Sequence, residues 1–329
     1  MQRAVSLAGC DVFYGSFRYA LLKCKVFHFN WFETPYGGRI HRKLSLMKKL
    51  LMLSILKIAG KKIIYTLHNR TSHLKEYRTH ERKLVQDWFI KNAHSIIIHS
   101  QESLSFLDSM CPALAKTRIH YVPHPNYINA YPDSCRYSGF EKKSGEIVLL
   151  FIGSVIPHKN IDVIIRTASQ LRKYTHLHFL ICGKGKPQYQ DELLSLIDSD
   201  NVTTDFRFIE DGEIPSLLGM CDAVLLPYST LSELNSGASY LAFSYGKTVI
   251  GTWTGTTRDV GSELVYCYEN TEDKDEHISR LKNAVLNFCA DFTDNHDAVM
   301  NKGRKLRQIM TEEHSLAKTA DALRRAYTL

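Results

Sequence analysis

Two kinds of hydrophobic pattern alternate along the whole chain. Short apolar runs rich in β-branched and aromatic residues predict buried strands, and longer segments with apolar residues every three or four positions predict helices. Strands are expected at 25–30, 62–67, 95–99, 118–122, 147–152, 178–182, 203–209, 223–226 and 248–251. Helices are expected at 39–59, 76–92, 100–109, 160–173, 189–198, 213–221 and 236–245, and over most of the last fifty residues. This order predicts parallel sheets covered by helices.

A polar stretch rich in turn-forming residues, 129–145, divides the pattern into two series. We therefore expect an α/β protein with two tandem doubly wound, Rossmann-like domains, spanning 1–138 and 139–310. A C-terminal helix, 311–329, is expected to pack back on the first domain. Ligands of such sheets bind at the carboxyl ends of the strands, so we expect the two domains to face a central cleft that holds the site.

Composition and cysteine usage narrow the class of protein. The 329 residues are 44% hydrophobic and 23% charged, as in ordinary globular proteins. The eight cysteines are scattered without a CxxC pair, which argues against a zinc site or a disulfide framework and favours a reducing cytoplasm. We expect neither a signal peptide nor a membrane-spanning helix.

Charge is divided unevenly between the two halves. Residues 1–140 hold 21 Lys and Arg against 8 Asp and Glu, a balance of +13, whereas 141–329 hold 21 against 26. A basic half predicts an anionic partner, either a membrane surface or nucleic acid. No RNA-recognition or helix-turn-helix pattern is present, so we expect no nucleic acid partner.

The segment 39–53 interleaves basic and apolar residues, as helices at a membrane interface do. In that interpretation Leu46, Leu50 and Leu53 insert into the lipid, and the basic residues that meet its surface are Arg42, Lys43, Lys48 and Lys49. The alternative is a helix packed on the core with a solvated basic face.

Three glycine-containing turns follow predicted strands and could hold a diphosphate. Ser236-Gly237 opens a helix, and the free N–H groups at a helix start attract anions. Gly153 is followed by Lys159, whose charge could neutralise the same group, and Gly183 begins a Gly-Lys-Gly turn. The simpler alternatives are an ordinary helix cap and a surface lysine.

Several short motifs, in their order and spacing, carry a family resemblance. They are TLHN at 66–69, AHSIIIHS at 93–100, VPHP at 122–125, the run from Gly153 to Asn160, CGKG at 182–185, CDAVLLPY at 221–228 and GKTVIG at 246–251. With these motifs the chain resembles GT-B glycosyltransferases of the family-4-like group, which build bacterial surface polysaccharides such as capsule, O-antigen or exopolysaccharide.

The resemblance implies roles for particular residues. The second domain would bind the nucleotide sugar and the first domain the acceptor, a saccharide that is lipid-linked, with the enzyme peripheral on the inner face of the cell membrane. The implied catalytic residues are His68, facing the donor sugar, and Glu233, holding its hydroxyls. The implied binding residues are Gly153, Lys159, Gly183, Tyr228, Ser236 and Gly237 for the donor diphosphate, Ile209 and Ile214 for the nucleobase, and His28, His73 and Glu76 for the acceptor.

No cofactor and no metal are expected, since GT-B enzymes as a class need no bound metal. The Asp198-Ser-Asp200 triplet follows a predicted helix rather than a strand, where aspartates commonly form turns.

The sequence departs from the pattern of this family in two respects, and these departures allow other functions. Leu241 stands where a second glutamate normally holds the nucleotide ribose, so retaining and inverting chemistry stay undecided. The segment before the strand at 25–30 is also shorter than the strand and glycine-rich loop that normally begin such a domain. The alternatives are a nucleotide-sugar epimerase of the same fold and an inactive, membrane-associated partner subunit.

Overall fold

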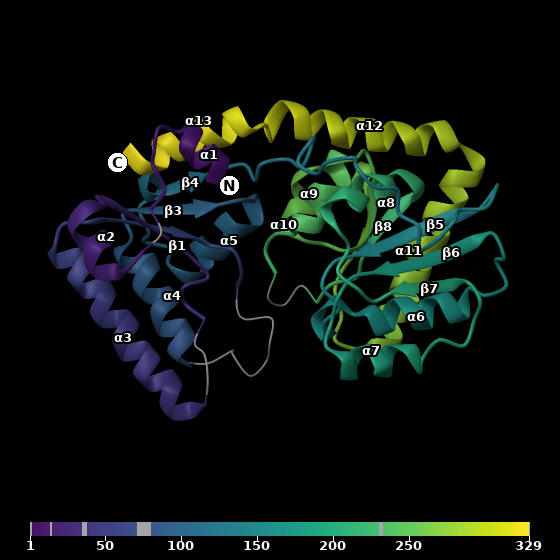
Figure 1. Cartoon of the computed structure of the whole chain (residues 1–329), viewed down its shortest axis with the longest axis horizontal. Coiled ribbons are helices and arrows are strands. Elements are labelled where there is room, and N and C mark those ends of the chain that lie inside the picture. Colours follow the sequence, from purple (N-terminus) through teal and green to yellow (C-terminus); the bar gives the residue numbers. More distant parts are fainter. Residues whose placement is uncertain (1, 14, 35–37, 71–79, 230–232, 329) are drawn as a thin grey trace. The chain divides into compact units, whose positions relative to one another are not determined.

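The computed structural model describes residues 2–13, 15–34, 38–70, 80–229 and 233–328 (Figure 1). The chain forms two compact units. The first comprises Met1–Pro125, Leu231–Asn235 and His314–Leu329, and the second comprises Asn126–Thr230 and Ser236–Glu313.

These limits differ from those expected at 138/139 and 310/311. Residues 126–138 lie in the second unit because Tyr137 is buried in its core. The Tyr137 N–H donates a hydrogen bond to Ser216 Oγ (3.0 Å), and its hydroxyl donates to Asp205 Oδ2 (3.0 Å).

The first unit contains one four-stranded parallel sheet with the order β1-β2-β3-β4. Its elements are α1 (Gln2–Leu7), α2 (Phe17–Lys23), β1 (Val26–Asn30), α3 (Arg39–Ile58), β2 (Lys62–Thr66), α4 (His80–Asn92), β3 (Ser95–Ile98), α5 (Gln101–Met110), a 3₁₀ turn η2 (Lys116–Arg118), β4 (Ile119–Tyr121) and α13 (Leu316–Thr328).

Helices from both ends of the chain cover one face of this sheet (Figure 1). Side chains alternate between the faces of a strand, so Ile63 and Tyr65 of β2 pack with Phe89 of α4, whereas Ile64 packs with Leu323 of α13. Helix α1 packs against α13 on that second face. The C-terminal helix therefore completes the core of the first unit.

Helix α3 turns a different face inward than its sequence suggested. Leu53 is fully buried, and Leu46 and Leu50 pack against the core beside it. The prediction that these three leucines insert into lipid is therefore wrong. The period of a helix shows that an apolar stripe exists, but Ile40, Leu44, Met47, Leu51 and Ile58 form a second stripe, and this one is exposed.

Lys49 also points inward rather than toward a membrane surface. Its ammonium group donates hydrogen bonds to the carbonyl oxygens of Phe32 (2.6 Å) and Thr34 (2.6 Å), and burial lowers its pKa. Lys49 therefore anchors the segment that follows β1.

The second unit contains a six-stranded parallel sheet with the order β10-β9-β8-β5-β6-β7. Its elements are β5 (Ile147–Ile152), η3 (Pro157–Lys159), α6 (Ile161–Gln170), β6 (Leu177–Cys182), α7 (Pro187–Leu194), β7 (Val202–Asp205), η4 (Asp211–Glu213), α8 (Ile214–Met220), β8 (Ala223–Leu226), α9 (Gly237–Ser244), β9 (Thr248–Thr252), α10 (Gly255–Asp259), η5 (Ser262–Leu264), β10 (Tyr266–Tyr268), α11 (Lys274–Asp294) and α12 (His296–Glu313). The strand order reverses between β8 and β5, which makes this pair the topological switch point of the sheet.

The remaining differences from the predicted elements are short. Strand β7 ends at Asp205 instead of residue 209, because Arg207 turns back to bind Glu213 through both terminal nitrogens (2.7 Å each). The sequence did not predict α1, α2 or β10, each of seven residues or fewer. In the described part of the chain, every helix is too short or too polar to cross a bilayer.

Candidate functional site

A lysine and a tyrosine meet at the switch point of the second unit. Asn160 Nδ2 donates a hydrogen bond to the Pro227 carbonyl (2.8 Å), and the Ser229 N–H donates to the His158 carbonyl (3.0 Å). These bonds join the turn after β5 to the segment after β8. Lys159 Nζ lies 3.3 Å from the centroid of the Tyr228 ring, a cation–π contact that fixes a positive charge there.

Gly153 and Gly183 allow two strand-end turns to approach each other closely. The Gly153 N–H donates to the Cys182 carbonyl (3.1 Å), and Gly183 has a φ of +145°. A Cβ added at Gly183 would lie 1.7 Å from the Gly153 carbonyl oxygen, whereas one added at Gly153 would meet no atom within 4 Å. Gly183 therefore has a packing role, and the backbone at Gly153 is open to a ligand.

Helix α9 begins directly after the loop that follows β8. The Ser236 hydroxyl accepts a hydrogen bond from the Ser239 N–H (3.3 Å), so Ser236 caps the helix, as the simpler interpretation expected. A Cβ added at Gly237 would meet only Tyr127 Oη, at 3.7 Å. The positive end of the helix is thus approachable at Gly237.

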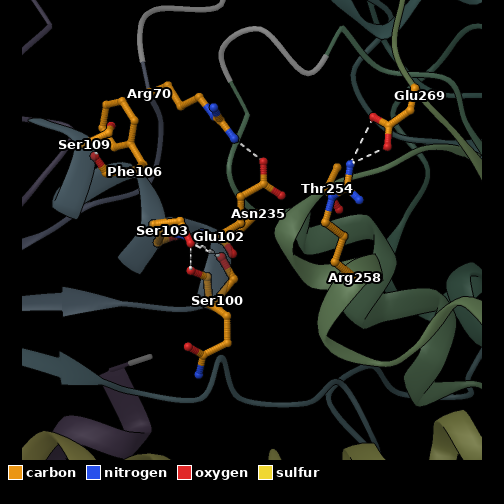
Figure 2. A network of polar contacts seen from close by, with 12 residues as sticks. Arg70, Ser100, Glu102, Ser103, Phe106, Ser109, Asn235, Thr254, Arg258 and Glu269 are labelled. Atoms are coloured by element: carbon orange, nitrogen blue, oxygen red, sulfur yellow. Dashed lines mark hydrogen bonds and ion pairs between the residues drawn. The ribbon is translucent and has the colours of Figure 1, made fainter.

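Glu233 belongs to the first unit, unlike Ser236 three residues later. It forms an isolated antiparallel bridge with Asn69, and only 5% of its surface is exposed. Leu234 is fully buried in the core of the first unit, and Asn235 Nδ2 donates to Ser103 Oγ of α5 (3.3 Å; Figure 2). These contacts hold the backbone at Glu233 beside Asn69, which follows β2 at the carboxyl-end edge of the first sheet.

Three histidines follow neighbouring strands of the first unit. His68 follows β2, His99 follows β3 and His124 follows β4, with ring centroids 5.6 Å and 6.0 Å apart in that order. Burial, reinforced by the neighbouring imidazoles, lowers the pKa of His68 to about 2 and that of His124 to about 3. All three rings are neutral at physiological pH, which suits hydrogen bonding better than proton uptake. His99 and His124 were not singled out from the sequence, although both lie in motifs that carry the resemblance.

Of the three candidate acceptor residues, His28 is among the residues that the structure describes. The two ring nitrogens of His28 share hydrogen bonds with Tyr327 Oη (2.7 Å) and Thr66 Oγ1 (2.6 Å), and burial lowers its pKa to about 4. His28 thus joins α13 to the sheet. His73 and Glu76 lie outside the described residues.

The predicted nucleobase residues are part of the second core. Ile209 and Ile214 are both buried there, and Phe208 beside them is the exposed apolar side chain of the same loop. Leu241, at the position of the expected second glutamate, packs against this core as well.

Comparison with known proteins identifies one family domain in the chain. Residues 138–296 match the model of the family described as glycosyl transferases group 1. No match to the chain is found among curated proteins.

Solved structures with a similar fold include the following three enzymes. HepE from Anabaena, solved in complex with UDP and glucose, aligns with a TM-score of 0.66 and 14% identity, covering 93% of this chain and 79% of HepE. Sucrose-phosphate synthase from Thermosynechococcus elongatus aligns with a TM-score of 0.70 and 14% identity, covering 93% and 74%. WaaG, described as a glycosyltransferase involved in lipopolysaccharide biosynthesis, aligns with a TM-score of 0.50 and 13% identity, covering 92% and 98%.

The chain therefore has the GT-B fold, and its matched domain is that of a glycosyltransferase. Within it, residues 138–296 carry a group 1 glycosyltransferase domain. The GT-B fold and the glycosyltransferase domain expected from the sequence motifs are therefore confirmed, whereas the family-4-like group stays a prediction.

Proposed function

We propose that the protein transfers a sugar from a nucleotide-diphosphate sugar to a lipid-linked saccharide in the assembly of a surface polysaccharide. The observation that carries the proposal is the Lys159–Tyr228 contact at the switch point, since open parallel sheets bind their ligands at this place. The UDP complex of HepE supports a nucleotide-sugar donor. That the reaction needs no metal stays a prediction.

The proposed chemistry is mainly electrostatic. The acceptor hydroxyl attacks C1 of the donor sugar while the bond from C1 to the diphosphate breaks, so negative charge grows on the leaving diphosphate, and the proton of the hydroxyl passes to that diphosphate or to water. Lys159 and the positive end of α9 at Gly237 stabilise that charge in place, without reorganising as water would. Neutral His68 can donate or accept a hydrogen bond at the sugar, but its low pKa argues against a role as a base.

Replacing Lys159 with alanine should weaken the binding of UDP more than that of uridine. A charge-assisted hydrogen bond contributes about 1.5–3 kcal/mol, so the dissociation constant for the diphosphate should rise about 10- to 150-fold. Isothermal titration calorimetry with UDP, GDP, dTDP and ADP identifies the preferred base before the variant is measured.

Lys173→Ala is the matched control. Lys173 also lies over a tyrosine ring, that of Tyr174, but it precedes β6 and so stands at the amino end of the sheet. Equal losses for uridine and UDP in Lys159→Ala, or an equal loss in Lys173→Ala, would contradict the diphosphate site. Diphosphate binding with no turnover on any sugar donor would instead indicate an inactive partner subunit.

The exposed stripe of α3 supports the membrane part of the proposal. Five large apolar side chains recur along it at intervals of three, four and seven residues: Ile40, Leu44, Met47, Leu51 and Ile58. Lys43 and Lys48 are exposed on either side of this stripe. An apolar stripe flanked by lysines fits an anionic bilayer, because the methyl groups enter the acyl boundary and the ammonium groups stay among the headgroups.

Charge reversal at Lys43 and Lys48 should reduce co-sedimentation with vesicles in which one lipid in four is phosphatidylglycerol. Each basic residue near such a surface contributes about 1 kcal/mol, so the double variant should bind at least tenfold more weakly at low salt. Leu44→Ser with Leu51→Ser should remove the binding that persists at high salt, since apolar burial is not screened.

Lys305→Glu, on the exposed face of α12, controls for net charge. Equal binding to neutral and anionic vesicles would contradict the electrostatic contribution. An unchanged vesicle affinity in both α3 double variants would contradict the proposed membrane surface.

A further inference from the structure

An exposed tryptophan stacks on His68 at the carboxyl end of the first sheet. Trp31 directly follows β1, and its ring lies 3.9 Å from the His68 ring, centroid to centroid, at an interplanar angle of 13°. His68 Nε2 donates a hydrogen bond to Asn30 Oδ1 (2.8 Å), which fixes the orientation of the imidazole ring. Trp31 is nevertheless 55% exposed, so a large aromatic surface faces solvent where parallel sheets bind ligands.

The backbone of Trp31 is strained. Its φ is +51°, in the left-handed region that bulky side chains rarely adopt. Such a conformation is unfavourable and persists only where the surrounding structure enforces it. Glycine would be favoured at this position if only the chain path mattered.

The residues after Trp31 enforce this conformation. Lys49 holds the carbonyl groups of Phe32 and Thr34, and the Phe32 ring packs against Phe29 and Phe89. Glu33, next in the chain, is buried and forms an ion pair with buried Arg82 (3.0 Å). A buried pair and a lysine anchor thus hold the turn in a geometry that presents an indole ring outward.

We infer that Trp31 is a stacking platform for a pyranose ring of the saccharide acceptor, with His68 as the ring beneath it. The inference rests on the proposed function for the existence of that acceptor. The face of an aromatic ring is electron-rich, and the axial C–H groups of a pyranose carry a small positive charge, so the two surfaces attract while both shed water. Because the face of the stack is planar and electron-rich, it favours a sugar with an apolar C–H face over an anionic group.

Saturation-transfer NMR with a panel of methyl glycosides tests the platform. The probes are methyl β-glucoside, methyl β-galactoside, methyl β-N-acetylglucosaminide and methyl α-rhamnoside, with sorbitol as a polyol that lacks a ring. Irradiating the aromatic protons of the protein should transfer saturation to ring C–H protons of at least one glycoside and not to sorbitol. Trp31→Leu should lose at least four fifths of that transfer, and Trp31→Phe should keep about half.

Trp253→Leu is the matched control in the second unit and should keep the full transfer. UDP binding by calorimetry should be the same in Trp31→Leu and in the original chain. A chain that fails to bind UDP but still shows Trp31-dependent transfer contradicts the proposed function and not the platform. No transfer to any glycoside, or transfer that persists in Trp31→Leu, overturns the platform.

Trp31→Gly separates a binding role from a structural one. Glycine relieves the strain of the left-handed backbone, which offsets the loss of the stack on His68, so the melting temperature should stay the same or rise. A marked fall in melting temperature would show that Trp31 serves the fold, and would overturn the inference.

Discussion

Replacing Gly183 with alanine should lower the melting temperature of the second unit by about 6–12 °C. The new Cβ would lie 1.7 Å from the Gly153 carbonyl oxygen, and φ at this position is +145°, which side chains rarely tolerate. Strain of this kind costs about 1–3 kcal/mol, and separating the turns weakens the Gly153–Cys182 hydrogen bond as well, for a total of about 3 kcal/mol. Differential scanning calorimetry measures the effect.

Gly219→Ala makes the same chemical change where the structure tolerates it. Gly219 lies within α8, has an ordinary φ, and a Cβ there would meet nothing within 4 Å. Alanine favours a helix over glycine by about 0.5–1 kcal/mol, so this variant should be equally stable or slightly more stable. If Gly183→Ala and Gly219→Ala have the same melting temperature, the two turns do not require the close approach that the structure describes.

Replacing Glu233 with glutamine should slow hydrolysis of the nucleotide sugar by about 100- to 1000-fold while leaving UDP affinity unchanged. The proposed contact is to sugar hydroxyls, and such contacts strengthen by several kcal/mol as charge develops on the ring. Glutamine keeps the shape of a side chain that is only 5% exposed, so the bridge to Asn69 should survive. Release of UDP from the donor into water measures the rate without an identified acceptor.

Glu192→Gln, exposed on α7, is the control for loss of one carboxylate and should react at the original rate. A Glu233→Gln variant with the original rate would remove Glu233 from the proposed mechanism. A loss of UDP affinity equal to the loss of rate would place its effect at the diphosphate instead of the sugar.

Local sequence patterns were sufficient for the architecture and for the positions of the strand ends. Buried parallel strands are runs of Val, Ile and Leu with glycine or proline at their carboxyl ends. Such runs can be recognised in the sequence without knowing which strands pair. Lys159 and Tyr228 could be named as candidates because ligands of such sheets bind at strand ends, and β5 and β8 are long enough to be recognised. The GT-B class followed from the same motifs.

Contacts between residues far apart in the chain decided the rest. A helix with two apolar stripes does not reveal which stripe is buried, so the sequence assigned Leu46, Leu50 and Leu53 to lipid and only packing placed them in the core. Likewise, no local sequence pattern shows that α13 packs on β2, that Glu233 pairs with Asn69 or that Trp31 stacks on His68.

The sequence by itself thus determined the α/β class and the strand ends, because these depend on periodicity over a few residues. The tertiary structure alone decided which faces are buried, which histidines stay neutral and which aromatic ring is presented. These properties depend on desolvation by residues hundreds of positions away, as Tyr327 beside His28 illustrates.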